Sequence, residues 1–251
     1  MPTATTTALA EPKPELPGQT VVVIDGSAGI GLETARRVRA EGADVILVAR
    51  TPERLEHAAR ESGALAGAAF DATDAAQLEQ FFEGLPGPVD HVIVTVGGPQ
   101  YEPLAEMDFA RARRFLDEHL MLPLHVARNA AGRLRPGGTL LFVGGTGGRR
   151  PGIGLALGSA VTVGLPSLVA GLALELAPVR VNLIAAASVD TPLSASLLAD
   201  QPDPRCTTPR IGRAVGPDDV AALATYVMVN PALTGATYDM DRGRQLLPAG
   251  V

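Results

Sequence analysis

Short apolar runs alternate along the chain with longer segments in which apolar residues recur at helical spacing. The runs contain few polar residues, which is typical of strands buried on both faces of a parallel sheet. The expected strands are Val21–Ile24, Val45–Ala49, Leu65–Phe70, Val92–Val96, Thr139–Val143, Val181–Ala185 and Thr237–Met240. The expected helices are Leu32–Glu41, Pro52–Arg60, Asp74–Phe82, Phe109–Leu134, Leu155–Leu176 and Asp218–Val229. This alternation predicts an α/β fold, a doubly wound parallel sheet of about seven strands with helices on both faces.

The first residues differ in composition from the rest of the chain. Residues 1–18 are rich in Pro, Thr and Ala and lack the basic segment and apolar core of a signal peptide, so they predict a flexible N-terminal arm. Residues 19–251 are expected to form one domain, because single α/β domains often reach this size. The apolar stretch 152–177 is broken by glycines and by Pro166, and it predicts a buried helix rather than a membrane span.

Charge and cysteine content narrow the possible partners. The net charge of −6 and the pI of about 5.2 make nucleic acid and anionic membrane surfaces poor partners. Cys206 is the single cysteine, which excludes an intrachain disulfide and a cysteine metal site. We therefore expect a cytoplasmic protein that acts on a small molecule and holds no metal.

The segment VVVIDGSAGIGL (21–32) joins an expected strand to an expected helix through a glycine-rich turn. Gly26, Gly29 and Gly31 let the backbone approach a pyrophosphate, and the free N–H groups at the helix start point at it. The strand before the turn and the helix after it strengthen this reading. The sheet is thus expected to be Rossmann-like, with its ligands beyond the carboxyl ends of the strands.

Nearly all of residues 21–241 resembles the short-chain dehydrogenase/reductase family. The matching segments are VVVIDGSAGIGLETA, LVAR, FDATD, VTVGG, LALELAPVRVN, VDTP and RIGRAVGPDDVA with LTGATYDMD. The resemblance implies a seven-stranded doubly wound sheet, an NAD(P)(H) site, and homodimers or homotetramers built on the two long helices.

The family's chemistry depends on an Asn, a Ser, and a Tyr and Lys spaced i, i+4 on one helical face, where the Lys lowers the Tyr pKa. Counting along the matching segments places these four positions at His119, Gly145, Gly158 and Thr162. No shift of the alignment restores the Tyr–Lys pair, because Lys13 is the only lysine. General acid–base catalysis is worth roughly 10²–10⁴ in rate, so ordinary carbonyl reduction is expected to be nearly silent.

The resemblance also implies a set of cofactor contacts. They are Gly26, Ser27, Gly29, Ile30, Gly31, Arg50, Asp71 and Gly98. Arg50 stands where NADP-preferring members hold the 2′-phosphate, and Asp71 where the adenine is bound. The family's first glycine, however, is Asp25 here, and a carboxylate ~4 Å from a pyrophosphate repels it by about 4 kcal/mol at an effective dielectric of ~20. We expect an NADP(H) site weakened by Asp25, with no cofactor as the alternative.

Three residues at this edge of the sheet are candidates for chemistry. Asp25 could stabilise its own turn, exclude a dinucleotide, or act as an acid or base. His119 is either a packed helical histidine or a titrating group at the pocket, and Pro123 is expected to kink the helix and free the His119 carbonyl. Thr146 could supply a hydroxyl beside the lost Ser position, or it bonds locally within its loop.

Two loops leave alternatives open. Thr191–Gly216 is long and rich in proline and arginine, so it is a candidate lid over the pocket or a variable surface loop. Arg149 and Arg150 could bind an anionic group or form a solvated turn. Cys206 has no histidine near it in sequence and is not expected to be a nucleophile.

These observations lead to three hypotheses about function. The first is a member of this family that acts on a small, hydrophobic molecule without the Tyr–Lys pair, as an atypical reductase or as a non-redox cyclase, isomerase or dehydratase. The second is a catalytically dead protein that binds a small molecule or a partner on the same scaffold. The third is an NADP(H)-dependent oxidoreductase whose proton relay is rebuilt around His119. Whether the chain is an enzyme at all stays open at this point, since fold alone does not fix function.

Overall fold

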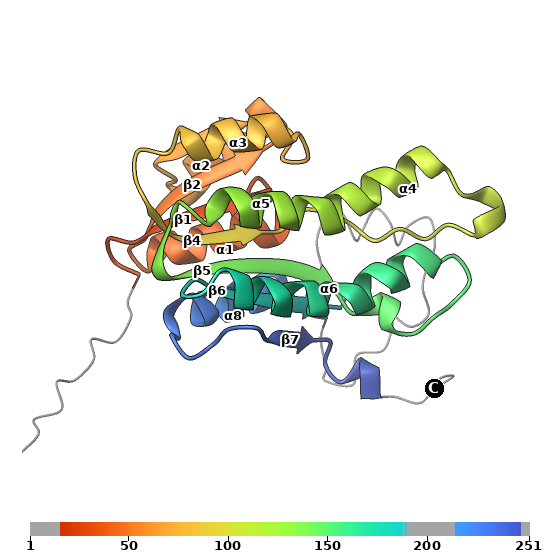
Figure 1. The fold of residues 1–251 in the computed structure, drawn as a ribbon. Helices are drawn as coiled ribbons and strands as arrows, with labels where there is room; N and C mark the ends of the chain where they lie inside the picture. Colours follow the sequence, from red (N-terminus) through yellow and green to blue (C-terminus); the bar gives the residue numbers. More distant parts are fainter. Residues whose placement is uncertain (1–15, 188, 190–213, 247–251) are drawn as a thin grey trace, which may run out of the picture.

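The computed structural model describes residues 16–187, 189 and 214–246 of the chain. Within these residues seven strands form one sheet of order β3-β2-β1-β4-β5-β6-β7 (Figure 1). Every neighbouring pair is parallel. The strand order reverses between β1 and β4, the point at which ligands bind in open α/β sheets. The expected Rossmann-like doubly wound fold is confirmed.

The strands lie close to the apolar runs of the sequence. They are β1 (Thr20–Ile24), β2 (Asp44–Ala49), β3 (Ala66–Ala69), β4 (Val89–Val94), β5 (Leu134–Gly145), β6 (Arg180–Ala186) and β7 (Thr237–Met240). All residues of β6 are buried, as its apolar pattern predicts. β5 begins earlier than expected because Leu134 pairs with Val89 across a register shift.

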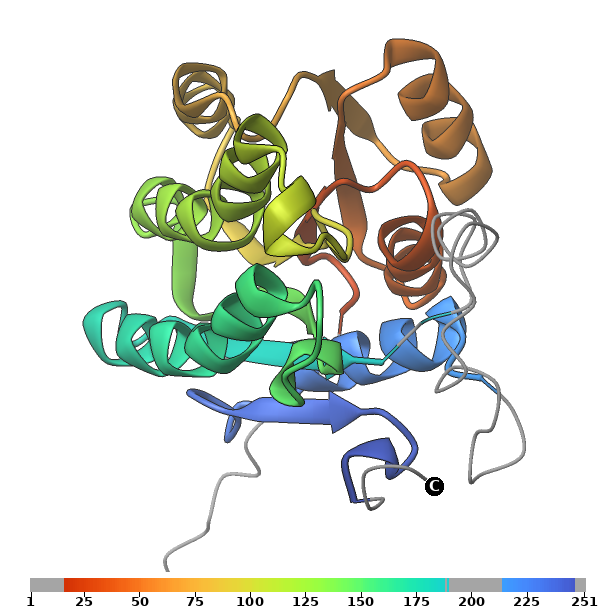
Figure 2. The ribbon, with the colours of Figure 1, turned by 90° about the vertical axis from the view of Figure 1, so that its right-hand side faces the viewer.

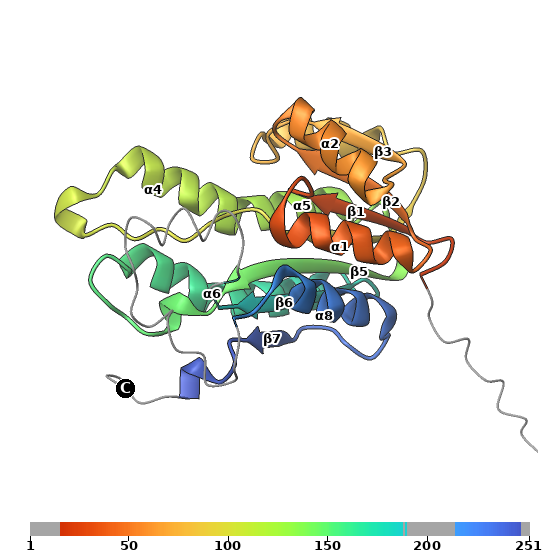
Figure 3. The same ribbon diagram turned by 180° about the vertical axis from the view of Figure 1, so that it is seen from behind.

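Helices cover both faces of the sheet. One face carries α1 (Gly29–Ala40), α2 (Pro52–Ser62) and α8 (Pro217–Val229), which pack into one apolar cluster (Figure 3). The other face carries α3 (Ala75–Glu83), α5 (Leu122–Ala130) and α6 (Ala156–Glu175), which pack into a second cluster (Figure 1). The expected N-cap of α3 is confirmed, because the Asp74 carboxylate accepts from the backbone N–H groups of Ala76 and Gln77.

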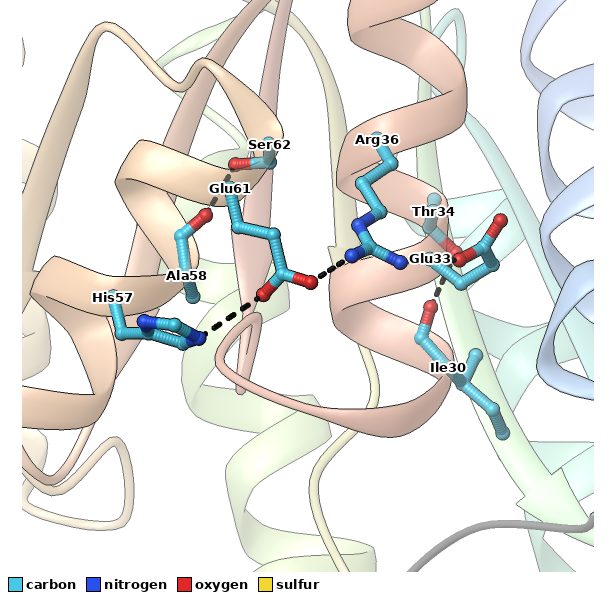
Figure 4. Close-up of polar contacts among 8 residues, drawn as sticks. All are labelled: Ile30, Glu33, Thr34, Arg36, His57, Ala58, Glu61 and Ser62. Atoms are coloured by element: carbon cyan, nitrogen blue, oxygen red, sulfur yellow. Dashed lines mark hydrogen bonds and ion pairs between the residues drawn. The ribbon is translucent and has the colours of Figure 1, made fainter.

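Helices α1 and α2 are joined at their surface by charged side chains. The Arg36 guanidinium of α1 pairs with the Glu61 carboxylate of α2, and His57 Nε2 lies 3.6 Å from the same carboxylate (Figure 4). Exposed pairs of this kind contribute only about 0.2–1 kcal/mol each. The position of α1 therefore depends mainly on its buried face, to which Ala35 and Val38 belong.

The long helix expected over Phe109–Leu134 is interrupted and shorter. The chain forms α4 (Phe109–Leu116), one π-helical turn (Asp117–Met121) and then α5. Pro123 has no N–H to give to the His119 carbonyl, and the backbone N–H of Leu122 donates instead to the Asp117 carbonyl, five residues back. The break expected near Pro123 is thus a π-turn that contains His119, whereas the expected end at Leu134 is wrong because that residue already belongs to β5.

Helix α6 is less buried than its sequence suggested. Its inner face packs on the sheet through residues such as Leu165 and Val169, but Val163 is 61% exposed and Leu174 is 83% exposed. Among the described residues it is the one helix long and apolar enough, by length and composition, to cross a bilayer, a test that core helices of globular folds also pass. The expectation of a fully buried helix is therefore wrong for its outer face.

Candidate functional site

The site lies beyond the carboxyl ends of the strands, the edge that faces the viewer in Figure 2. At the end of β1 the backbone enters the left-handed region at Asp25, with φ of 67°. Asp is one of the few non-glycine residues that tolerate this conformation. The backbone N–H groups of Asp25 and Gly26 both donate to the Val48 carbonyl, at 2.9 and 3.0 Å. The turn therefore keeps the conformation of a glycine turn although a carboxylate stands in it.

Asp25 lines a small hollow at the ends of β1, β2 and β3. The hollow measures about 10 Å³ and is lined by the charged residues Asp25, Arg50, Asp71 and Glu118, together with Val48, Ala49, Phe70, Ala72 and Val96. We call these four charged residues the acidic hollow. Burial raises the pKa of the Asp25 carboxyl; Arg50 opposes that shift, while Glu118 and Asp71 add to it. An ionised Asp25 side chain is disfavoured in this space, because the carboxyl groups of Asp71 and Glu118 face it.

The other two acids of the hollow are held by Arg114 of α4. The Arg114 guanidinium lies 3.1 Å from both the Asp71 and the Glu118 carboxylates. Asp71 also accepts from the backbone N–H and the hydroxyl of Thr73, at 3.1 and 2.7 Å. Although burial acts to raise it, these hydrogen bonds and Arg114 hold the pKa of Asp71 below its usual value. Asp71 is thus ionised, and Arg114 holds both carboxyl groups in place.

A larger cavity of about 230 Å³ lies next to this hollow, and Val96 lines both spaces. Its walls come from the ends of β4, β5 and β6, the π-turn, and the first half of α6. All four positions of the family's catalytic set border it, namely His119, Gly145, Gly158 and Thr162. The fold brings these four positions together, and none of the four has the side chain of that set. Ile30 and Gly98, both expected to contact a cofactor, line the same cavity.

The loop after β5 packs directly on the helix that would have carried the Tyr and Lys. A Cβ atom at Gly148 would lie 2.5 Å from the Gly158 carbonyl oxygen and 2.7 Å from Thr162 Oγ1. Only a glycine allows this approach, because real Cβ contacts are not that short. At Gly145 and Gly158, in contrast, the nearest atoms to a Cβ would be backbone oxygens at 3.9 and 3.7 Å. At Gly145 and Gly158 the cavity wall therefore has free space beside the glycine. At Gly148 the loop and α6 are in direct contact.

His119 enters this cavity from the π-turn. Its ring lies against Phe115, with centroids 4.1 Å apart, and it covers the Cα of Gly97 so closely that a Cβ there would lie 2.6 Å from Nε2. His119 Nδ1 is 2.9 Å from the Phe115 carbonyl oxygen, which can only accept, so Nδ1 carries the proton. Burial lowers the pKa of the ring, against opposing contributions from the Phe115 carbonyl and Glu118. At neutral pH the imidazole is uncharged and its Nε2 is an acceptor.

Thr146 is placed differently from the other candidates. It is 1% exposed and is not one of the residues that line the cavity. Its carbonyl accepts from Gln245 Nε2 at 3.0 Å, and the Arg150 guanidinium donates to the Gln245 carbonyl at 2.7 Å. Arg149 forms a two-point ion pair with Asp239 of β7. These contacts fasten the β5–α6 loop to the C-terminal segment, so Arg149 is neither a solvated turn residue nor a cavity residue.

Some residues of the site carry no distinctive sequence signal. Glu118 was not a candidate, although it immediately precedes His119 and lies i+4 from Arg114, a spacing that indicates a shared helical face. Gln100 follows the end of β4 and lines the cavity. Only the structure reveals Gly148 as part of the site, through its contact with α6. Most of the candidate lid Thr191–Gly216, and Cys206, lie outside the described residues.

The residues present can be tested against the dinucleotide that the resemblance implies. Helix α1 suits a phosphate, because Ala28 at its N-cap provides no side-chain cap and its first turn contains no acid. The acidic hollow holds about one water molecule and is lined by three acids, which opposes the approach of the anionic groups of a dinucleotide. The site therefore fits a phosphate group but does not fit a whole dinucleotide. Among the described residues there is also no cluster of His, Cys, Asp or Glu that could hold a metal.

Comparison with known proteins supports the family that the sequence resembles. A model of the short chain dehydrogenase family matches residues 19–202. The chain is 27% identical to the short-chain dehydrogenase/reductase malC of Malbranchea aurantiaca, over 92% of this chain and 96% of that protein. It is 30% identical to 3beta-hydroxysteroid dehydrogenase 1 of Eggerthella lenta, over 93% of this chain and 96% of that one.

Solved structures have the same fold. The structure of MalC superposes with a TM-score of 0.84 at 24% identity, covering 94% of this chain and 99% of the other. A short chain dehydrogenase from Burkholderia cenocepacia J2315, solved in complex with NADP, superposes with a TM-score of 0.83 at 25% identity, covering 92% and 99%. The architecture of the described residues is thus shared over almost the whole length of these proteins.

Proposed function

The chain belongs to the short-chain dehydrogenase/reductase family, and from that premise we propose that it binds a small, mainly apolar molecule and promotes a non-redox reaction of it. The reaction class is a cyclisation, isomerisation or dehydration in which the cavity orients the reacting groups. The family supports a small-molecule substrate, and the departures of this chain from its catalytic set support a different chemistry.

One observation carries the proposal. His119, Gly145, Gly158 and Thr162 border a single cavity, and none of them supplies the Ser, Tyr or Lys on which carbonyl reduction in the family depends. Holding reactants in a productive arrangement can by itself lower a barrier by about 7–11 kcal/mol, so a cavity without a Tyr–Lys pair is able to catalyse. The relative MalC is described as a reductase and Diels–Alderase, and a cycloaddition is a reaction that needs orientation more than acid–base groups.

We assign roles to the candidate residues on the same grounds. His119 contacts the bound molecule through its uncharged imidazole. Asp25 disfavours a dinucleotide, and it does not take part in the chemistry because it lies in the acidic hollow and not in the cavity. Thr146 fixes the loop after β5 and acts on the site only through that loop.

The alternative is an NADP(H)-dependent oxidoreductase whose proton relay includes His119. Two observations favour it: the uncapped N-terminus of α1 and the position of Arg50 beside Asp25. The related protein from Burkholderia cenocepacia that was solved with NADP adds to this alternative. It requires that Asp25 be protonated or displaced when the cofactor binds.

Self-association belongs to the same proposal. We propose a homodimer or homotetramer formed through the outer face of α6, where Val163 and Leu174 are exposed. Sedimentation of the wild type and of Leu174→Glu tests it. A smaller sedimentation coefficient for the variant is expected, and an unchanged one contradicts it.

The test of the function is turnover with and without nicotinamide. The purified protein is incubated with a panel of small apolar polyenes and hydroxylated aromatics, and products are identified by mass spectrometry. We expect products of unchanged mass or of mass reduced by water, formed without NADPH. Gly145→Val tests whether turnover takes place in the cavity. Its added side chain has room to extend into the cavity, so it should abolish turnover. Products that require NADPH consumption would favour the oxidoreductase, and binding without any product would favour a catalytically dead binder.

A further inference from the structure

The polar groups of the cavity differ in how firmly their hydrogen-bonding roles are fixed. The hydroxyl of Thr162 can donate or accept. The His119 ring is held by a hydrogen bond from Nδ1, which sets the role of its other nitrogen. His119 therefore decides what kind of ligand group the cavity prefers.

His119 is fixed as an acceptor. Its Nδ1–H donates to the Phe115 carbonyl oxygen at 2.9 Å, and in a neutral imidazole this leaves a lone pair on Nε2. Among the described residues no donor reaches Nε2, and the atom is not one of the buried atoms closed off from the cavity. The ring packs between Phe115 and Gly97, and turning it by 180° would break the hydrogen bond to the Phe115 carbonyl, which favours the observed orientation.

Gln100 lines the same cavity but does not compete with His119 for the ligand. Its Nε2 group donates to Glu102 Oε2 at 3.1 Å, which orients the amide. Its Oε1 is fully buried without a hydrogen-bond partner among the described residues, so a ligand in the cavity does not contact that atom. His119 Nε2 is therefore the acceptor with a fixed role that the cavity exposes.

This arrangement is the reverse of a carbonyl-reducing site. A carbonyl oxygen needs a donor, whereas His119 Nε2, the side-chain group with a fixed role here, accepts. Resting on the function proposed above, we infer that the cavity recognises a molecule that presents a hydroxyl or N–H group to His119 Nε2, and that it selects phenols, alcohols and N–H heteroaromatics over ketones and aldehydes.

The test uses three naphthalene probes of similar size. 2-Naphthol donates a hydrogen bond, 2-fluoronaphthalene does not, and 2-acetonaphthone presents a carbonyl. Calorimetric titration of the wild-type protein should give 2-naphthol an affinity about three- to tenfold higher than either other probe, the range that one net hydrogen bond supplies. Equal affinities, or tighter binding of 2-acetonaphthone, overturn the inference while the proposed apolar cavity stands. No binding of any probe overturns both.

Two further measurements assign the preference to His119. His119→Phe keeps a ring between Phe115 and Gly97 and removes the acceptor, so the preference for 2-naphthol should vanish. His57→Phe, on the exposed surface of α2, is the matched control and should keep the preference. Because His119→Phe could fail to fold, the ring is also observed in the wild type. In ¹⁵N-histidine spectra, 2-naphthol should shift the unprotonated Nε2 resonance of His119, and 2-fluoronaphthalene should not. A preference that survives His119→Phe, or an Nε2 resonance that 2-naphthol leaves unmoved, overturns the role of His119.

Discussion

The acidic hollow and the cavity are neighbours that share the wall residue Val96, and they depart from the family in opposite ways. The hollow has gained charge, since Asp25 replaces a glycine and faces Asp71 and Glu118. The cavity has lost charge and hydrogen-bond donors, since Gly145, Gly158 and Thr162 replace a Ser, a Tyr and a Lys. The first change opposes an anionic cofactor, and the second leaves room for an apolar ligand. Both differences support the proposal that the site binds and orients a ligand without hydride transfer.

The largest expected effect comes from removing the charge in the hollow. Asp25→Gly restores the residue that the left-handed backbone prefers and removes the repulsion between a carboxylate and a pyrophosphate, which is worth about 4 kcal/mol at ~4 Å. We expect NADPH to bind about 10²–10³ times more tightly to this variant than to the wild type in calorimetric titration.

Two controls separate charge from shape in that result. Asp25→Asn keeps a residue tolerated at positive φ and removes only the charge, so it should recover most of the gain. Asp218→Asn, in the first turn of α8, should change nothing. An affinity for NADPH that is the same in wild type, Asp25→Gly and Asp25→Asn would show that the hollow does not control the cofactor.

The next effect concerns the closure of the cavity by Gly148. Gly148→Ala places a methyl group 2.5 Å from a backbone oxygen of α6, and the helix or the loop must move. We expect the free energy of unfolding to fall by about 1–3 kcal/mol, the usual cost of overpacking, as measured by denaturant titration. Gly147→Ala is the matched control, because the nearest atom to its Cβ would be the Tyr101 hydroxyl at 3.9 Å. Equal stability of the two variants would mean that the loop does not press on α6.

The smallest effect is a pH dependence of stability caused by Asp25. In the unfolded chain this carboxyl titrates at its ordinary pKa of 3.8, and burial raises the pKa in the folded protein. Folding therefore binds a proton between these two pKa values, and the contribution of Asp25 to stability falls as the pH rises through that interval. Asp25→Asn removes the titrating group, so its stability relative to the wild type should increase from pH 3.8 upward and then level off.

Chemical denaturation of both proteins over a range of pH measures this difference. A difference that stays constant with pH would mean that the folded-state pKa of Asp25 is not raised. A difference that shrinks with rising pH would mean that Asp25 is stabilised as a carboxylate. Arg50, whose charge lowers the Asp25 pKa, would then be the candidate partner.

Much of the fold could be predicted from the sequence because it depends on patterns that repeat locally. The apolar runs gave the strands, and the Asp74 cap of α3 followed from its sequence context. β5 could not be delimited in this way, because the pairing of Leu134 with Val89 is a long-range contact. The π-turn was only half predictable, since Pro123 indicates a missing hydrogen bond but not how the backbone compensates.

The site was predictable where position along the chain decides the outcome. The convergence of His119, Gly145, Gly158 and Thr162 follows from where the strands and helices end. The acidic partner Glu118 and the contact of Gly148 with α6 depend on packing between distant segments, which no local pattern records.

The central claim is that charge closes the dinucleotide site while the cavity stays open. Calorimetric titration of the wild-type protein with NADPH, and separately with NADH, tests it most directly. We predict no measurable heat up to millimolar concentrations of either cofactor, because the acidic hollow repels both. Binding of NADPH at micromolar affinity, tighter than NADH, would contradict the claim and would mean that Asp25 is accommodated while Arg50 holds the 2′-phosphate.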